Sequence, residues 1–347
     1  MKVAIVHDFL NQYGGAEKVI EVFNDLFPDA PVFTSIYVAG KLPQVFREMN
    51  VKTSFMQKFP FLDRHFKKYL IFYPKAIESF DLTGYDIILS SSSSFAKGAI
   101  KGKNACHICY CYAPMRYVWD YNHYIEKENF SKPVLKILPY IIRKLKKWDI
   151  RTINRVDYYI AISNHIKDSI KKCYNRDSTV IYPPVNVKNF KVSNKVEDYF
   201  LIVSRLSAYK NIDLVIEAFN YLGLHLKIAG EGPHRKTLES MVKNRKIEFL
   251  GRLNNEELVE VYSKCQAYIF PGKEDFGITP VEAQASGRPV IAYAEGGALE
   301  TIIDGVTGLF FRENSRDSLV ETIKKFLKIS DDFISSKIVE NASRFDT

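Results

Sequence analysis

Residues 270–287 read FPGKEDFGITPVEAQASG, and this stretch decides the fold. The short apolar run that ends at Phe270 predicts a strand, and the polar residues after it predict a loop. Thr279 is a favoured helix cap and Pro280 has a φ angle suited to the first helical turn, so we expect a helix to begin near these residues. A strand that leads through a loop into a helix is the repeating unit of parallel α/β sheets.

Other short apolar segments repeat this scheme on both sides of the stretch. Segments of helical length separate them, which is the pattern of βαβ units. The expected strands are Val3–His7, Ile87–Leu89, Ala105–Cys111, Tyr158–Ile162, Tyr199–Ser204, Leu226–Ala229, Ile247–Leu250, Ala267–Phe270 and Pro289–Tyr293. Each half of the chain is therefore predicted to be a doubly wound, Rossmann-like α/β unit.

The length of the chain and one proline pair predict two domains. A chain of 347 residues exceeds the usual span of a single hydrophobic core. Pro183 and Pro184 stop helix and strand alike, so the segment around them is the best candidate for a linker. We expect an N-terminal Rossmann-like domain over residues 1–190 and a C-terminal one over residues 191–347.

The net charge of +9 is distributed unevenly along the chain. Residues 1–190 hold 28 Lys and Arg against 17 Asp and Glu, a net charge of +11, whereas the remainder holds 21 against 23. The basic half predicts an anionic partner, and composition leaves nucleic acid and an anionic membrane surface open. No stretch contains the roughly 18 apolar residues of a spanning helix, and the first apolar run is too short for a secretory signal. We expect a cytoplasmic protein, with peripheral membrane association open.

Two basic, aromatic-rich segments, residues 58–80 and 127–155, are predicted inserts in the first half. The second insert carries apolar residues at helical spacing among lysines and arginines. These apolar residues are Val134, Leu138, Ile141, Leu145 and Trp148. An amphipathic surface helix and a membrane contact both fit this pattern.

The five cysteines indicate reduced thiols, because their number is odd and no export signal precedes them. Cys106, Cys109 and Cys111 lie in a predicted strand, whose alternation places Cys106 on the face opposite the other two. No second Cys-x-x-Cys pair follows, so a structural zinc site is disfavoured.

The loop within residues 270–287 carries the chemistry of a sugar-nucleotide site. Glu274 lies in the loop and Glu282 on the following helix, and their carboxylates can accept hydrogen bonds from sugar or ribose hydroxyls. The free amides at the start of that helix can receive a diphosphate. Gly14 and Gly15 occupy the corresponding place after the first strand, where glycine permits either close approach to a ligand or a tight turn.

A nicotinamide cofactor is disfavoured. Residues 230–233, Gly-Glu-Gly-Pro, follow a predicted strand but lack the third glycine of a dinucleotide-binding fingerprint. The chain also contains no Gly-x-x-x-x-Gly-Lys-Ser/Thr loop and no Asp-x-Asp pair of the kind that holds a metal on a nucleotide diphosphate. We therefore expect no metal and no cofactor besides the nucleotide-sugar co-substrate, with protein cations neutralising the diphosphate.

The chain resembles the retaining glycosyltransferases of the GT-B fold grouped in family four, and especially their O-antigen mannosyltransferase-like branch. Glu274 and Glu282 match the family's Glu-x7-Glu motif. The other matches span nearly the whole chain and are Gly14-Gly15, residues 204–211, residues 230–233, Gly296-Gly297 and residues 305–308. The resemblance implies two Rossmann-like domains that face each other across a cleft, with the donor held mainly by the C-terminal one.

The resemblance also implies a function and a set of site residues. It implies retaining, metal-independent transfer from a nucleotide sugar, GDP-mannose being favoured, to a glycan or lipid-linked acceptor in surface polysaccharide (lipopolysaccharide) assembly. The residues expected to be catalytic are Glu274, Arg205, Lys210 and Tyr112. The residues expected to bind the donor are Gly14, Gly15, Arg205, Lys210, Phe276, Gly277, Ile278 and Glu282, with Arg205 and Lys210 on the diphosphate.

The sequence departs from the family at two places. Tyr112 fills the position of a common family histidine that contacts the transferred sugar. A phenol can donate and accept hydrogen bonds but cannot serve as a cation. His107, on the preceding strand, is expected to be a core histidine rather than its replacement. The family also continues beyond residues 341–347 into a helix that crosses back to the first domain, and we expect that helix to be missing.

Two other classes of function stay open. A sugar-nucleotide hydrolase or epimerase could share the fold, although an epimerase needs a second titratable pair, for which only Tyr112 and Asp120 are available. A non-catalytic membrane-binding or nucleic-acid-binding module is the other alternative. The carboxylate of Glu274 would repel a nucleic-acid backbone, so no nucleic-acid partner is expected.

Overall fold

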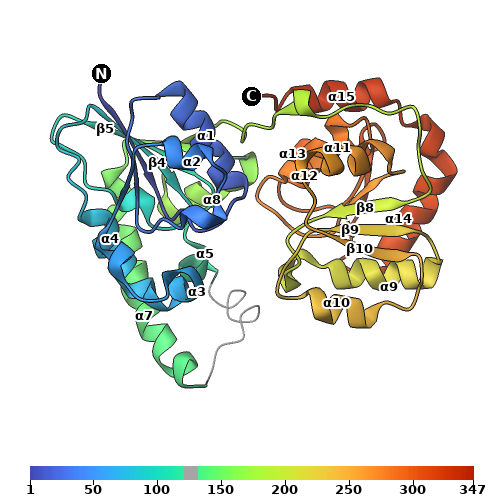
Figure 1. Ribbon diagram of the computed structural model, residues 1–347, viewed down its shortest axis with the longest axis horizontal. Coiled ribbons are helices and arrows are strands. Elements are labelled where there is room, and N and C mark those ends of the chain that lie inside the picture. Colours follow the sequence, from blue (N-terminus) through green and yellow to red (C-terminus); the bar gives the residue numbers. More distant parts are fainter. Residues whose placement is uncertain (121–131) are drawn as a thin grey trace. The chain divides into compact units, whose positions relative to one another are not determined.

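The computed structural model describes residues 1–120 and 132–347, without the side chains of residues 63, 64 and 132–136. The chain forms two compact units, Met1–Pro183 and Pro184–Thr347 (Figure 1). The division falls between the two prolines of the predicted linker, a few residues before the expected boundary at residue 190.

In the N-terminal unit, the described residues form a seven-stranded parallel sheet of order β3-β2-β1-β4-β5-β6-β7. The strands are β1 (Val3–His7), β2 (Val32–Thr34), β3 (Val51–Thr53), β4 (Ile87–Ser92), β5 (Cys106–Cys111), β6 (Tyr158–Ala161) and β7 (Ser178–Val180). The helices are α1 (Gly15–Leu26), α2 (Val45–Glu48), α3 (Leu62–His65), α4 (Tyr73–Glu78), α5 (Arg116–Trp119), α7 (Lys132–Thr152) and α8 (Asn164–Tyr174). Short 3-10 helices are η1 (Ala39–Lys41), η2 (Phe55–Lys58), η3 (Phe66–Phe72), η4 (Ala96–Gly98) and η5 (Ile153–Arg155).

In the C-terminal unit, the described residues form a six-stranded parallel sheet of order β10-β9-β8-β11-β12-β13. The strands are β8 (Phe200–Val203), β9 (Leu226–Ala229), β10 (Ile247–Gly251), β11 (Tyr268–Phe270), β12 (Val290–Tyr293) and β13 (Gly308–Phe311). The helices are α9 (Ile212–Leu222), α10 (Arg235–Met241), α11 (Asn255–Lys264), α12 (Ile278–Ala285), α13 (Ala298–Thr301), α14 (Arg316–Ile329) and α15 (Ser335–Ser343). Short 3-10 helices are η6 (Val187–Asn189), η7 (Ala208–Lys210) and η8 (Ser330–Asp332).

Both sheets have the strand order of a doubly wound Rossmann-like unit, which confirms the predicted fold class. All of the predicted strands are present, with ends that differ by a residue or more in most cases. The sequence pattern does not predict β2, β3, β7 or β13. Three of these contain only three residues each, too few to show a periodicity.

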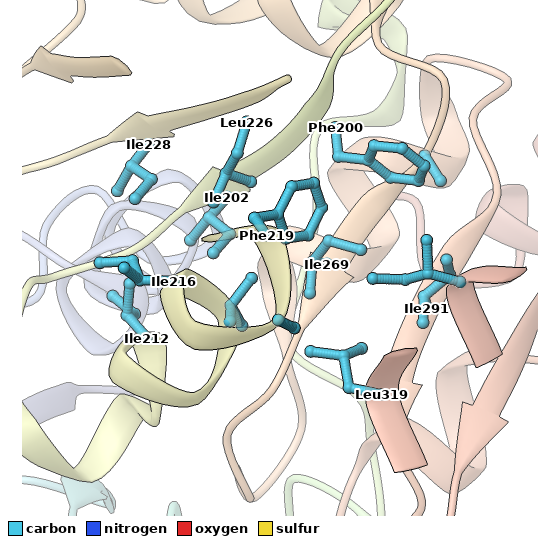
Figure 2. Close-up of a cluster of buried hydrophobic side chains, with 14 of the residues drawn as sticks. Phe200, Ile202, Ile212, Ile216, Phe219, Leu226, Ile228, Ile269, Ile291 and Leu319 are labelled. Atoms are coloured by element: carbon cyan, nitrogen blue, oxygen red, sulfur yellow. The ribbon is translucent and has the colours of Figure 1, made fainter. Parts of the chain in front are cut away.

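The two faces of the C-terminal sheet bury alternate residues of each strand. Ile202 and Ile269 point toward α9 and α14, and Figure 2 shows them with Phe219 and Leu319 in one apolar cluster. Tyr268 lies on the opposite face with residues of α11, α12 and α13. Because both faces are covered by helices, the strands read as continuous apolar runs rather than as alternating ones.

The burial of one face of helix α7 argues against the interpretation of the apolar residues in the second basic insert as a membrane contact. Leu138, Leu145 and Trp148 are buried in the core of their own unit, where the ring of Trp148 fills the space beside Gly98. The apolar stripe therefore packs internally, and it is not available to a membrane. Residues 127–131 of this insert, and the side chain of Val134, lie outside the described residues.

A buried ion pair joins α7 to η4. The Lys97 ammonium lies 3.0 Å from Asp149 Oδ1 and donates to the Asp149 carbonyl and to Thr152 Oγ1, while Trp119 Nε1 donates to Asp149 Oδ2 at 2.8 Å. The side chains of Lys97 and Asp149 are 2% and 0% exposed. Each charged side chain is therefore stabilised by the other, because water cannot reach either group to solvate it if its partner is removed.

His107 is a core histidine, as predicted. Its Nε2 lies 2.8 Å from Ser90 Oγ and its Nδ1 lies 3.2 Å from the carbonyl oxygen of Arg155. Burial lowers the pKa of His107 to about 4, so the ring is neutral at physiological pH. Among the described residues, no helix combines the length and the apolar character needed to cross a bilayer.

Candidate functional site

The predicted donor loops meet at the centre of the C-terminal sheet. One loop follows β8 and carries Arg205 and Lys210, and the other follows β11 and carries Glu274. β8 and β11 are adjacent strands at the point where the strand order reverses, and their carboxyl ends are the usual ligand position in such a sheet. A small pocket there is lined by residues that include Ser204, Lys210, Tyr268, Gly272 and Glu274.

Lys210 and Glu274 form an ion pair in this pocket. The two side chains are only 14% and 27% exposed, yet both stay within reach of a ligand. Gly272 lies against the Lys210 backbone, since a Cβ added there would be 3.4 Å from the Lys210 Cα. An incoming phosphate would compete for the ammonium and leave the carboxylate to accept hydroxyl groups.

Gly296 and Gly297 brace the Glu274 loop. The Gly297 amide donates to the Glu274 carbonyl at 2.8 Å, and Gly296 has a φ of +66°. A Cβ on Gly296 would lie 2.3 Å from the Glu274 carbonyl oxygen, and one on Gly297 would lie 2.3 Å from the Phe276 Cα. Glycine is therefore required at both positions by the close approach of the two backbones.

Helix α12 begins two residues earlier than the predicted cap at Thr279 and first residue at Pro280 imply. Its first residue is Ile278, after Gly277, whose φ of +89° favours glycine. Thr279 is not the cap, and its Oγ1 lies 2.8 Å from the hydroxyl of Tyr268 instead. The side chain of Phe276 is buried against Phe345, so only its backbone is available for the expected role in donor binding.

Glu282 is more enclosed than its predicted role requires. The residue is 4% exposed, and its Oε2 accepts a hydrogen bond of 3.0 Å from the hydroxyl of Tyr262 on α11. Burial, together with the nearby Glu282 carboxylate, raises the pKa of Tyr262 well above its ordinary value. Tyr262 therefore remains a donor, and it fixes one of the two oxygens of Glu282.

The glycines of residues 230–233 shape the neighbouring Arg205 loop rather than the pocket itself. A Cβ on Gly230 would lie 1.9 Å from the Ser204 carbonyl oxygen, and one on Gly232 would lie 2.2 Å from that of Leu206. Arg205 lies between Ser204 and Leu206 in the sequence, and it is exposed. This turn thus presents Arg205 at the surface near the pocket.

In the N-terminal unit, the structure places Tyr112 beside the Gly14-Gly15 loop. Gly14 is extended and precedes α1, which begins at Gly15. The Tyr112 hydroxyl lies 2.8 Å from Ser91 Oγ and 3.2 Å from the Ala16 carbonyl oxygen. The carboxyl ends of β4 and β5 and the start of α1 therefore meet at this tyrosine.

Two polar groups near this loop are not among the predicted site residues. The Asp8 carboxylate is buried and accepts hydrogen bonds from the amides of Ser93, Phe95 and Ala96 at 2.6 to 2.7 Å, which fixes the loop after β4. Asn11 Oδ1 is buried and has no hydrogen-bond partner among the residues that the structure describes. A polar residue directly after a buried strand is the one sequence signal that could have indicated Asp8.

Two family models cover nearly the whole chain. The Glycosyltransferase Family 4 model matches residues 13–189, and the model of glycosyl transferases group 1 matches residues 186–344. The chain belongs to glycosyltransferase family 4.

Individual relatives of this family-4 chain are similar over parts of their length. The O-antigen chain mannosyltransferase of Salmonella typhimurium is 34% identical over 155 residues, which cover 40% of this chain and 43% of that protein. The GDP-mannose-dependent alpha-mannosyltransferase of Corynebacterium glutamicum is 35% identical over 108 residues, which cover 31% of this chain and 26% of that protein. The chain thus spans about half or less of the length of the curated relatives it matches.

Among solved structures, Anabaena HepE in complex with UDP has the same fold. The TM-score is 0.74 at 18% identity, and the match covers 100% of this chain and 96% of HepE. At 18% sequence identity, this similarity shows that the family-4 chain and HepE share a fold.

Proposed function

We propose that this family-4 protein transfers a hexosyl group, mannose, from GDP-mannose to a glycan or lipid-linked acceptor in surface polysaccharide assembly. The observation that carries the proposal is the pairing of Lys210 with Glu274 at the ligand position of the C-terminal sheet. The Salmonella relative is an O-antigen chain mannosyltransferase and the Corynebacterium relative a GDP-mannose-dependent alpha-mannosyltransferase, which supports mannose and GDP as the sugar and nucleotide.

Each group at the pocket has a task in this proposal. Lys210 and Arg205 hold the diphosphate as an ammonium and a guanidinium, and the amides at the start of α12 add partial positive charge. Glu274 accepts hydroxyl groups of the transferred sugar, and Glu282 accepts those of the ribose. Because these cations neutralise the leaving diphosphate, the reaction needs no metal ion. Retention of the anomeric configuration is proposed from the resemblance to the retaining family-four enzymes.

The donor is tested by thermal shift and by transfer assays in excess EDTA. GDP-mannose at 100 times its dissociation constant should stabilise the protein by about 2.7 kcal/mol. UDP-sugars at the same concentration should stabilise it less, because they bind more weakly. Transfer of mannose should persist in EDTA, since Arg205 and Lys210 replace the metal charge.

Three results would contradict these assignments. Loss of transfer in EDTA with recovery in Mn²⁺ or Mg²⁺ would overturn metal independence. Stronger stabilisation by a UDP-sugar would overturn the donor. Release of free mannose that no acceptor suppresses would identify a sugar-nucleotide hydrolase.

Peripheral association of the N-terminal unit with the inner membrane face is also part of the proposal. The proposal is supported by the net charge of +11 over residues 1–190 and by a set of exposed apolar side chains in the two basic inserts. These side chains are Phe61, Ile71, Phe72, Ile137 and Tyr140, with exposed fractions between 39% and 72%. Lysines around apolar side chains suit an anionic bilayer surface.

The membrane proposal predicts binding to anionic vesicles that weakens with salt. Phe61→Glu should lower vesicle binding about tenfold or more, because an aromatic ring leaves the bilayer and a negative charge approaches it. Tyr221→Glu is the matched control, since Tyr221 is also largely exposed but lies in the other unit. Equal sedimentation with neutral and anionic vesicles, or with neither, would contradict the proposal.

A further inference from the structure

A continuous series of hydrogen-bonding contacts links three adjacent strands of the N-terminal unit. His7 Nδ1 lies 3.0 Å from Ser91 Oγ, and Ser91 Oγ lies 2.8 Å from the Tyr112 hydroxyl. The Tyr112 hydroxyl lies 3.2 Å from the Ala16 carbonyl oxygen. These residues stand at the carboxyl ends of β1, β4 and β5 and in the first turn of α1.

The chemistry of the last contact sets the direction of all three hydrogen bonds. A carbonyl oxygen only accepts, so Tyr112 must donate its single proton to Ala16. Burial raises the pKa of Tyr112 well above its ordinary value, and the phenol therefore keeps that proton. The Tyr112 oxygen must then accept from Ser91, whose own oxygen must accept from His7 Nδ1.

The environment of the other ring nitrogen is compatible with this direction. His7 Nε2 lies 3.8 Å from Glu17 Oε1, and both side chains are 4% exposed. Because 3.8 Å exceeds a hydrogen-bond distance, this contact assigns no proton to Nε2 and leaves Nδ1 free to donate to Ser91. The Glu17 carboxylate lies close to Gly14, since a Cβ added to Gly14 would lie 3.3 Å from Glu17 Oε2.

We propose that His7 is a positioning residue that donates from Nδ1 and, through Ser91, directs the Tyr112 proton to the Ala16 carbonyl. With its proton committed, Tyr112 offers a substrate only an accepting oxygen. The sugar hydroxyl that it contacts must therefore be a donor. This consequence for the substrate rests on the proposed transferase function, whereas the direction of the hydrogen bonds does not.

The direction is tested by NMR on protein labelled with ¹⁵N-histidine. Two-bond couplings between the ring nitrogens and the carbon-bound ring protons show which nitrogens carry protons, and the His7→Asn variant assigns the His7 signals. We expect Nδ1 of His7 to be protonated at neutral pH. A bare Nδ1 would overturn the proposal whether or not the protein transfers mannose.

The role of His7 is tested by a double-mutant cycle in the transfer assay. His7→Leu should lower kcat/KM about tenfold, the equivalent of one net hydrogen bond, and His7→Asn should recover most of this loss because its amide can donate to Ser91. In the Tyr112→Phe background, His7→Leu should change kcat/KM less than twofold.

Two outcomes separate this role from a purely structural one. Equal tenfold losses from His7→Leu in both backgrounds would show that His7 does not act through Tyr112. If His7→Asn had the melting temperature of the wild type but did not recover kcat/KM, this would also show that His7 does not act through Tyr112. Absence of transfer in every variant and in the wild type would refute the proposed function alone, and the NMR result would still decide the direction.

Discussion

Lys97→Met should destabilise the N-terminal unit by about 3 to 5 kcal/mol. The methionine nearly preserves the volume of the lysine but removes the charge that compensates the Asp149 carboxylate, which is 0% exposed. For a domain of this size, each kcal/mol lowers the melting temperature by about 2 to 4 °C, so we expect a decrease on the order of 10 °C. Both tryptophans of the chain, Trp119 and Trp148, lie in this unit, and their fluorescence reports its unfolding selectively.

Two further variants test the cause of this effect. Lys101→Met removes a cation that pairs with Asp157 near the surface, and it should cost about 1 kcal/mol or less. Combining Lys97→Met with Asp149→Leu should recover part of the stability, because both buried charges are then gone. A Lys97→Met variant as stable as the wild type would contradict the interpretation of the buried pair.

Glu274→Gln should lower kcat by roughly a hundredfold and leave the affinity for the nucleoside diphosphate nearly unchanged. A carboxylate on the transferred sugar acts more strongly in the transition state than in the bound donor. Glu282→Gln should instead weaken the binding of both donor and nucleoside diphosphate, because contacts to ribose are the same before and during reaction. Calorimetry with the diphosphate and steady-state kinetics measure the two effects separately.

Glu295→Gln is the matched control for Glu274→Gln. Glu295 pairs at 2.7 Å with Lys273, the residue directly before Glu274, but Glu295 is 41% exposed and lies outside the proposed site. Its amide variant should keep kcat within about twofold, as expected of an exposed ion pair. If Glu274→Gln lost diphosphate affinity and Glu282→Gln did not, the two roles would have to be exchanged.

The sequence predicts the parts of the fold that depend on local pattern. Residues 270–287 show a strand, a loop and a helix through periodicity and capping, and the structure has all three. The exact start of α12 could not be predicted, because Gly277 and Thr279 both suit a helix start. What decides between them is the contact of Thr279 with Tyr268 on the strand.

Contacts between distant residues account for the rest. Nothing local in Gly296 and Gly297 shows that their backbones lie against Glu274 and Phe276. The apolar stripe of α7 was equally ambiguous, since amphipathicity shows that one face is covered but not by what. The burial of Glu282 depends on Tyr262 of another helix, which no spacing in the sequence links to it.

The Asp8 carboxylate joins two segments that are far apart along the chain. It lies directly after β1, yet the amides that it binds follow β4, 85 to 88 residues later. During synthesis, β1 therefore has neither its partner strand β4 nor its hydrogen-bond donors until the chain has grown past Ala96. Contacts between residues so far apart in the sequence slow folding. Until these contacts form, the apolar strand β1 and the Asp8 carboxylate remain exposed to water. The pairing of β1 with β4 at the centre of the N-terminal sheet can therefore form only after the loop that follows β4 has been synthesised.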